Sequence, residues 1–395
     1  MPAIYGFFGD PMIIAVDEAV PYWKEAFSDL GTLRPYSAKE LRPADVRDAD
    51  ILIVRTVTPV NAPLLEGSLV RFVGAASAGT DHIDQEYLKA RGIHFSYAAG
   101  CNANSVSEYI VTALHIIASR KGWNLKNKSL AVVGVGNVGS RVAKKARALG
   151  MDVLLCDPPL RDSTGDAQYR LLDDVLGADI LSFHVPLAFA GPYPTWHMVN
   201  RRFLDRLSPE QFLLNSSRGP IFDSREVKAA LLESRIGGVV IDVWEEEPRI
   251  DYSLLELADV GTPHIAGNAL DGKIQATEMI RDALFAHFKI IPSQRLNPVY
   301  PADQVLRAAP EKDPQTSVLS VLLQAFDLQK QDADLRTLQD AATETAAEGF
   351  ERLRTRKPLR PEFRHFIVDL DKRHIHLADT FAALGFGIKG TGIAE

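Results

Sequence analysis

Three polar segments in the middle of the chain carry side chains suited to removing hydride from a hydroxyl group. Such a reaction needs a base for the O–H proton, a cation for an acidic substrate group and a redox cofactor. We predict that His264 is the base, that Arg218 binds the substrate, and that Glu247 orients the imidazole and raises its pKa. The segments are Asn215-Ser216-Ser217-Arg218-Gly219, Asp242-Val243-Trp244-Glu245-Glu246-Glu247-Pro248 and Thr262-Pro263-His264-Ile265-Ala266-Gly267.

Each of these residues also has a structural alternative. A histidine after proline is often a packing residue, Glu245 to Glu247 can be a solvated run of charge, and Arg218 before Gly219 can lie in a surface turn. Their joint occurrence behind a nucleotide-binding motif favours the chemical interpretation.

That motif follows the strand-like run Leu130 to Val133 and precedes a helical stretch, Arg141 to Leu149. The order strand, glycine-rich turn and helix is typical of dinucleotide binding. The first glycine permits the turn, the second lets the cofactor's pyrophosphate approach, and the third lets the helix pack on the strand. The predicted cofactor-binding residues here are Gly134, Gly136, Asn137, Val138 and Gly139.

Asp157 follows the next predicted strand, 157 − 139 = 18 residues after Gly139. A carboxylate in this position accepts hydrogen bonds from the ribose hydroxyls and repels a 2′-phosphate, so NAD is predicted rather than NADP. Arg161 is the one nearby residue that would favour a phosphate.

These motifs require parallel sheets to position them. Short apolar runs alternate with helical segments, which predicts an α/β protein with helices on both sheet faces. We expect a doubly wound, Rossmann-type nucleotide-binding domain at 105–267, inserted into a flavodoxin-like substrate (lid) domain formed by 12–104 and 268–296. A small C-terminal α/β domain should occupy 297–395. The first domain is expected to begin near Met12, after Met1 to Pro11.

The individual elements can be predicted from periodicity. Ser105-Val106-Ser107-Glu108 matches a capping box, so a long helix should start there. Helices are also predicted at Tyr22 to Leu30, Thr316 to Phe326 and Leu335 to Arg354. The predicted strands are Met12 to Val16, Ile51 to Val54, Phe72 to Ala75, Val153 to Cys156, Ile180 to Phe183, Phe212 to Leu214, Val239 to Val243 and Phe366 to Val368.

Composition argues against several classes of partner. The chain has 395 residues and a net charge of −7, with no long basic run, which argues against nucleic acid and anionic membranes as partners. There is no apolar stretch of transmembrane length. Cys101 and Cys156 have no partner at zinc-ligand spacing, so we expect no metal site and a reducing, cytoplasmic location.

Taken together, these motifs resemble the D-isomer-specific 2-hydroxyacid dehydrogenase family. The shared features are the glycine motif, an Arg before Gly, an Asp-Val segment that ends in Glu-Pro, and a Pro-His pair, all found between Met12 and about Pro298. The resemblance implies the roles given above to Arg218, Glu247 and His264. It also implies that Asp242 contacts the nicotinamide carboxamide, and that Val185 and Gly267 contact NAD.

Within this family the chain is similar to members that oxidise 4-phospho-D-erythronate during pyridoxal phosphate biosynthesis. The resembling stretches include Val54-Arg55-Thr56-Val57-Thr58 and Ala78-Gly79-Thr80-Asp81-His82. Those members form homodimers through a C-terminal domain, which we therefore expect here. The resemblance places Thr56, Ser77 and Asn268 at the substrate, although Asn268 stands where tyrosine is usual and Val185 where threonine is usual.

A phosphorylated substrate needs a cation. Six basic residues lie close together near the C-terminus, and Arg360 is predicted to reach the phosphate across the dimer interface. A solvated basic face is the alternative. Two other functions remain open: a dehydrogenase for another small acid, such as 3-phosphoglycerate, glyoxylate or glycerate, and a non-catalytic NAD-sensing protein. The basic residues are Arg352, Arg354, Arg356, Lys357, Arg360 and Arg364.

Overall fold

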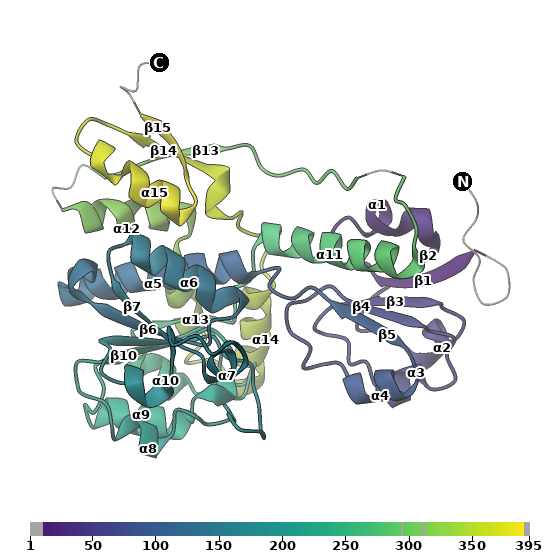
Figure 1. Ribbon diagram of the computed structural model, residues 1–395, viewed down its shortest axis with the longest axis horizontal. Coiled ribbons are helices and arrows are strands. Elements are labelled where there is room, and N and C mark those ends of the chain that lie inside the picture. Colours follow the sequence, from purple (N-terminus) through teal and green to yellow (C-terminus); the bar gives the residue numbers. More distant parts are fainter. Residues whose placement is uncertain (1–10, 294, 310–312, 391–395) are drawn as a thin grey trace. The chain divides into compact units, whose positions relative to one another are not determined.

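The computed structural model describes residues 11–293, 295–309 and 313–390 (Figure 1). The chain forms two compact units. The first contains the residues up to Asn102 together with Ala269–Tyr300, and the second contains Ala103–Asn268 together with the chain from Pro301 onward. The first ten residues of the segment Met1 to Pro11 lie outside the described part of the chain.

The first unit is built on a parallel sheet whose strand order, within the described residues, is β2-β1-β3-β4-β5. This is the flavodoxin-like order, with the chain reversing direction across the sheet next to the first strand. The apolar runs that predicted β1, β3 and β4 are buried in it, as expected for a sheet covered on both faces. The strands are β1 (Met12–Asp17), β2 (Gly31–Tyr36), β3 (Ile51–Val54), β4 (Phe72–Ala75) and β5 (His94–Tyr97).

Two hydrophobic cores sandwich this sheet. On one face Ile14 and Phe72 pack against α1 (Trp23–Phe27) and α11 (Leu270–Phe288). On the other face the sheet packs against α2 (Pro43–Val46), α3 (Ala62–Leu65) and α4 (Gln85–Ala90). The single helix predicted over Tyr22 to Leu30 is wrong in part, because its last turn tightens into a 3-10 helix at Ser28–Leu30.

The second unit contains a parallel sheet with the order β12-β11-β10-β9-β6-β7-β8 among its described residues. The first strand, β6, lies inside the sheet, with β7 and β8 on one side of it and β9, β10 and β11 on the other, which is the doubly wound Rossmann order. Strand β12 is an additional strand at one edge. The predicted fold class is therefore confirmed. The strands are β6 (Ser129–Val133), β7 (Asp152–Cys156), β8 (Tyr169–Arg170), β9 (Ile180–Phe183), β10 (Phe212–Asn215), β11 (Gly238–Ile241) and β12 (Val260–Gly261).

The helix that opens this unit starts earlier than its predicted capping box. Helix α5 runs from Ala103–Lys121, so Ser105 lies inside it and does not cap it. The Ser105 hydroxyl instead donates to Glu362 at 2.5 Å, because both side chains are buried together. The other helices around this sheet are α6 (Asn137–Ala148), α7 (Pro158–Thr164), α8 (Arg201–Leu204), α9 (Ser224–Leu232) and α10 (Tyr252–Leu257).

The C-terminal segment belongs to the same compact unit and contributes to both of its cores. Val318 and Phe363 pack with α5 and α6, whereas Leu335 and Phe350 pack on the opposite face of the sheet. One prediction here was wrong: the helical pattern of Leu335 to Arg354 is divided between two helices. The elements are β13 (Gln304–Arg307), α12 (Pro314–Ala325), α13 (Leu328–Arg336), α14 (Thr343–Arg354), β14 (Phe366–Leu370), α15 (Ala378–Leu384) and β15 (Gly387–Gly390).

A buried ionic cluster joins this segment to α5. Arg360 donates to Glu108 at 2.7 Å and to the Ser105 carbonyl at 2.8 Å. Phe363 N–H donates to the other Glu108 oxygen at 2.9 Å, and Asn104 donates to both Glu108 and Glu362. Each oxygen of Glu108 therefore has a partner, which is the condition for burying a charge.

None of the helices in the described ranges has the length and apolar character that a membrane crossing requires.

Candidate active site

The three polar segments meet at one edge of the Rossmann sheet. Strands β10, β11 and β12 are parallel neighbours, with Asn215 beside Ile241 and Ile241 beside Gly261. Each strand leads directly into one segment, so Arg218, Glu247 and His264 all follow carboxyl ends of adjacent strands. Ligands of doubly wound sheets bind outside this edge.

His264 and Glu247 form a hydrogen-bonded pair. His264 Nδ1 lies 2.8 Å from Glu247 Oε2, and the other carboxylate oxygen accepts the backbone N–H of Trp244 at 2.7 Å. Burial alone would lower the pKa of His264, but the hydrogen bond and negative charge of Glu247 outweigh it and raise that pKa above its ordinary value. Since Nδ1 faces the carboxylate, Nε2 is the nitrogen left to exchange a proton with another molecule.

Asp242 supports the loop that carries His264. Its carboxylate accepts the backbone N–H groups of Ile265 and Ala266 at 2.8 and 2.9 Å, and the Thr262 hydroxyl at 2.6 Å. Thr262 in turn lies 2.8 Å from the hydroxyl of Tyr109 on α5. This buried chain of hydrogen bonds was not visible in the sequence, because its members are distributed over three separate segments.

The Arg218 turn is held against the glutamate segment. A Cβ atom at Gly219 would overlap the backbone carbonyl of Trp244, so only glycine allows this approach. Asn215 also donates to the Arg218 carbonyl at 2.9 Å, and Arg218 Nη1 donates to the Ser217 carbonyl at 2.8 Å. Backbone packing therefore fixes where the guanidinium emerges.

The glutamate run is not a simple solvated patch. Glu245 accepts a short hydrogen bond from His197 and another from Ser224 N–H at 3.1 Å, whereas Glu247 bonds His264. Glu245 and Glu247, two positions apart, are thus hydrogen-bonded to different histidines.

The glycine-rich turn has the geometry of a pyrophosphate cradle. Gly134 has φ +87°, and a Cβ there would lie 2.8 Å from the His184 carbonyl. A Cβ at Gly139 would overlap the Gly134 carbonyl, so this glycine permits close helix–strand packing. Gly136 has open space where its Cβ would be, which leaves room for a ligand. Asn137 and Val138 then begin α6, whose free N–H groups attract phosphate.

Asp157 anchors this turn. Its Oδ2 accepts the Val135 N–H at 2.7 Å and its Oδ1 accepts the Leu160 N–H at 3.0 Å. Arg161 lies 3.8 Å from Asp174, which gives its guanidinium an acidic neighbour.

A cavity of about 390 Å³ opens beside the turn and is lined by Gly134, Gly136, Asp157, His184 and Val185, among others. His184 Nδ1 is buried and has no hydrogen-bond partner among the described residues. An unsatisfied buried nitrogen, a turn that needs glycine and a carboxylate in the lining of the same cavity all fit NAD. His184 was not among the cofactor-binding residues predicted from the sequence.

The predicted substrate residues fall in both units. Within the first unit, Thr56 and Ser77 follow the adjacent strands β3 and β4 at one sheet edge. Ser77 donates to the Gly79 carbonyl at 2.9 Å, and Thr56 is exposed. Arg55 lies at the same edge and bonds the buried Asp17 at 2.8 Å. It is a cation that the sequence analysis left without a role.

Within the second unit, Asn268 lies close behind His264 in the chain and donates to the Arg354 carbonyl at 2.8 Å. The largest effects on the His264 pKa are desolvation, which lowers it, and Glu247, which raises it. The positive charge of Arg354 also lowers this pKa. The last turn of α14 therefore brings a cation into the neighbourhood of His264.

Arg360 lines a cavity together with Ile265 and Asn268, and its guanidinium pairs with Glu108. Its side chain is 11% exposed and makes a structural contact with Glu108 within this chain, and the phosphate contact across a dimer interface stays a prediction. The physical reason is burial: Glu108 is fully enclosed, and a buried carboxylate needs a charged partner. Within the described ranges there is also no group of three or more potential metal-ligating side chains.

Comparison with known proteins agrees with this geometry. Residues 111–266 match the model for the D-isomer specific 2-hydroxyacid dehydrogenase NAD binding domain. The erythronate-4-phosphate dehydrogenase of Salinibacter ruber is 42% identical, covering 86% of this chain and 90% of that one. The chain belongs to the erythronate-4-phosphate dehydrogenase family. The Marinobacter nauticus member is 38% identical, over 96% of this chain and 100% of its own, so the likeness extends into the C-terminal segment.

Solved structures show the same fold at lower identity. D-lactate dehydrogenase from Aquifex aeolicus, complexed with NAD and lactic acid, has a TM-score of 0.57 at 24% identity and covers 70% of this chain and 95% of its own. A glyoxylate reductase from Paecilomyes thermophila has a TM-score of 0.58 at 21% identity and covers 73% of this chain and 96% of its own. The predicted family and the more specific resemblance within it are both confirmed.

Proposed function

We propose that this chain oxidises the C2 hydroxyl of 4-phospho-D-erythronate with NAD, forming (R)-3-hydroxy-2-oxo-4-phosphooxybutanoate for pyridoxal phosphate biosynthesis. The observation that carries the chemistry is the His264–Glu247 pair, which lies at the same sheet edge as Arg218. Membership of the erythronate-4-phosphate dehydrogenase family carries the choice of substrate.

In this proposal His264 is the general base. Its Nδ1–H is donated to Glu247, so the lone pair of Nε2 can accept the proton of the C2 hydroxyl while the C2 hydrogen leaves with its electron pair. The resulting imidazolium is stabilised by the carboxylate of Glu247. NAD supplies the hydride acceptor. Asp242 keeps the His264 loop in place through its two backbone N–H partners.

The substrate carries two acidic groups, and the second unit offers two arginines for them. Arg218 follows a strand at the same sheet edge as His264, and the charge of Arg354 acts on the His264 pKa. We assign the carboxylate to Arg218, because its turn is fixed by the backbone contact at Gly219. We assign the phosphate to Arg354 in place of Arg360, because the charge of Arg354 is close enough to act on the His264 pKa. Asn268 contributes by holding the Arg354 backbone, and Thr56 and Ser77 are proposed as further substrate contacts.

The proposed NAD site uses the glycine-rich turn, the α6 N-terminus, Asp157 and the cavity beside Val185. Asp242 is proposed as a contact of the nicotinamide carboxamide, and Gly267 as a contact of NAD. His184 Nδ1 is a further candidate, since it is buried without a partner in the described part of the chain.

The test is a comparison of kcat/KM for 4-phosphoerythronate, 3-phosphoglycerate, glycerate and lactate, with NAD and with NADP. We expect 4-phosphoerythronate with NAD to be preferred by about a hundredfold or more. Equal or better use of another acid would retain the dehydrogenase and discard the assigned substrate. Tight NAD binding without turnover on any of the acids would point to an NAD-sensing protein.

The assembly and location are parts of the same proposal. We propose a homodimer formed through residues 297–395, treated as a functional domain distinct from 105–267, with 12–104 and 268–296 as the substrate domain. Val305 on β13 is 53% exposed, which supports an interface there. Analytical ultracentrifugation of the full chain and of Val305→Asp tests this, and an unchanged dimer would exclude β13. Two buried free thiols support a cytoplasmic location, which cell fractionation can test.

A further inference from the structure

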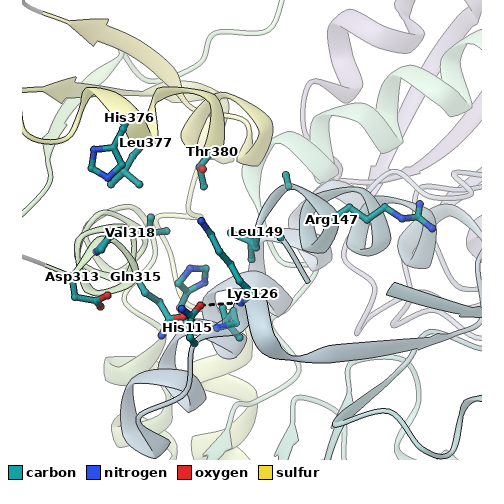
Figure 2. A pocket seen from close by; sticks show the side chains of 15 residues that line it. His115, Lys126, Arg147, Leu149, Asp313, Gln315, Val318, His376, Leu377 and Thr380 are labelled. Atoms are coloured by element: carbon teal, nitrogen blue, oxygen red, sulfur yellow. Dashed lines mark hydrogen bonds between the residues drawn. The ribbon is translucent and has the colours of Figure 1, made fainter. Parts of the chain in front are cut away.

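A second cavity, of about 350 Å³, lies between the nucleotide-binding fold and the C-terminal segment within the second unit (Figure 2). Its walls come from α5, α6 and the 3-10 turn Leu125–Asn127 on one side, and from α12, the 3-10 turn Ile375–Leu377 and α15 on the other. None of its lining residues also lines the cavity beside the glycine-rich turn. Its volume is within the range of small-molecule sites.

His115 gives this cavity a buried hydrogen-bond acceptor. The side chain is 2% exposed, and Nδ1 lies 2.8 Å from the Val111 carbonyl of the same helix. Because a carbonyl can only accept, Nδ1 must carry the proton, which leaves Nε2 as an acceptor. Nε2 has no partner in the ranges that the structure describes. Burial lowers the pKa of His115 to about 4, so the ring is neutral at neutral pH.

Lys126 provides a cation in the same space. Figure 2 shows the Lys126 side chain and the His115 ring extending into the cavity, with Thr380 and His376 on the opposite wall. The Lys126 side chain passes over Gly150. A Cβ atom at position 150 would lie only 3.0 Å from Lys126 Cγ, so the glycine leaves room for the lysine side chain in this position. No acidic partner of its ammonium occurs among the described residues. The Arg147 guanidinium, in contrast, points away from the cavity.

Two of the other polar wall residues, Gln315 and Asp313, are already engaged. Gln315 accepts the Leu125 N–H at 2.9 Å and donates to the Trp123 carbonyl at 2.7 Å. Asp313 caps α12 through Thr316 N–H at 2.9 Å. Leu149, Val318 and Leu377 form apolar wall between them. The groups available to a ligand are thus the Lys126 ammonium and the Thr380 hydroxyl, suited to an anion, with the His376 ring on the same wall as Thr380, and the neutral His115 acceptor, suited to a hydroxyl donor.

We propose that this cavity is a second ligand site, which takes a small phosphate ester that also carries a hydroxyl group. The phosphate binds Lys126 and the hydroxyl of Thr380, the ester's hydroxyl donates to His115 Nε2, and its carbon chain contacts Val318. The bound molecule bridges the two parts of the unit and so stabilises their packing.

The test uses the purified full chain saturated with NAD, titrated calorimetrically with glycerol 2-phosphate and with inorganic phosphate as probes. Glycerol 2-phosphate should bind with a Kd below about 10 mM and more tightly than phosphate, which lacks carbon atoms and a donor for His115. Lys126→Ala should weaken binding by about tenfold or more, because a charge-assisted hydrogen bond is lost. Thr380→Val, a nearly isosteric change, should also weaken it.

Two matched variants control for other sites. Lys144→Ala removes an exposed lysine of α6 that does not line the cavity, and should leave binding unchanged. Arg218→Ala should also retain binding, since Arg218 belongs to the proposed active site. Absence of binding by both probes, equal binding by Lys126→Ala, or loss only in Arg218→Ala would each overturn the proposal. The readout does not involve turnover, so failure of the assigned enzymatic function would not affect it.

Discussion

At the scale of single residues, the His264–Glu247 pair leads to a pH prediction. Glu247 raises the pKa of His264, and the base must be unprotonated, so kcat/KM for oxidation should rise with pH through an inflection above the ordinary histidine value. Glu247→Gln removes the charge that stabilises imidazolium. The inflection should move to lower pH, and kcat should fall by about a hundredfold or more because the ring is less well oriented.

The shift of the inflection is measured from the pH profiles of kcat/KM for the wild-type enzyme and for Glu247→Gln. Glu246→Gln is the matched control, because the neighbouring Glu246 makes no described side-chain hydrogen bond, and it should leave the profile unchanged. An inflection that stays in place in Glu247→Gln would mean that another group titrates.

Asp157 makes a second prediction at this scale. Its carboxylate anchors the glycine-rich turn through Val135 N–H and is placed to disfavour a 2′-phosphate. The preference for NAD is the ratio of kcat/KM with NAD to kcat/KM with NADP. Asp157→Asn should lower this ratio by about tenfold or more, because a hydrogen bond to a charged group contributes about that much. Asp152→Asn, which alters an exposed carboxylate at the start of β7 that does not line the cavity, is the control. An unchanged ratio would remove Asp157 from cofactor selection.

At the scale of elements, α13 of the C-terminal segment stabilises the edge strand that leads to His264. Asp332 accepts the Gly261 N–H of β12 at 2.7 Å, and Arg336 bonds both Asp332 and the carbonyls of Leu255 and Ala258. Asp332→Ala leaves a buried N–H without its acceptor. The free energy of unfolding should fall by about 1–3 kcal/mol, with a loss of kcat because His264 is less well placed.

Urea denaturation and steady-state kinetics measure these two effects. Asp334→Ala on the same helix removes a surface carboxylate that pairs with Lys330 and Arg356, and should cost no more than about 1 kcal/mol. If both variants were equally stable and active, the contact between α13 and β12 would have no part in supporting the site.

At the scale of the whole molecule, Glu108 links folding to pH. Desolvation raises its pKa to about 7, although Arg360 opposes the shift. The folded state therefore retains a proton that the unfolded chain releases near its ordinary, lower pKa. Folding stability should consequently fall as pH rises between those two values, by an amount on the order of 3 kcal/mol.

The midpoint of urea unfolding, measured from pH 5 to pH 8, tests this for the wild-type chain and for Glu108→Gln. The variant has no proton to release, so the decline attributable to Glu108 should disappear. At pH 8, where Glu108 is ionised, Arg360→Ala leaves the carboxylate buried without its cation and should cost about 3–5 kcal/mol. A wild-type stability that rises over this range would contradict the raised pKa.

Local pattern was sufficient for much of this protein. Apolar runs bounded by turns predicted the inner strands of both large sheets, because a parallel strand buried on both faces must be apolar throughout. The edge strands β2, β5, β8 and β12 were not predicted. The glycine-rich turn predicted the cofactor cradle, because only glycine allows those backbone approaches. Arg218, Glu247 and His264 were found from the segments that follow three strands, since parallel strands bring their carboxyl ends together.

Only the tertiary structure decided which partners these side chains take. Glu245 and Glu247 are equivalent in the sequence, and the direction of one loop assigns them to different histidines. Arg360 pairs with Glu108 across 252 positions of sequence, and Ser105 leaves its predicted capping role for the same buried cluster. Such contacts depend on how helices far apart in the chain pack, and periodicity records only which face of each helix is buried.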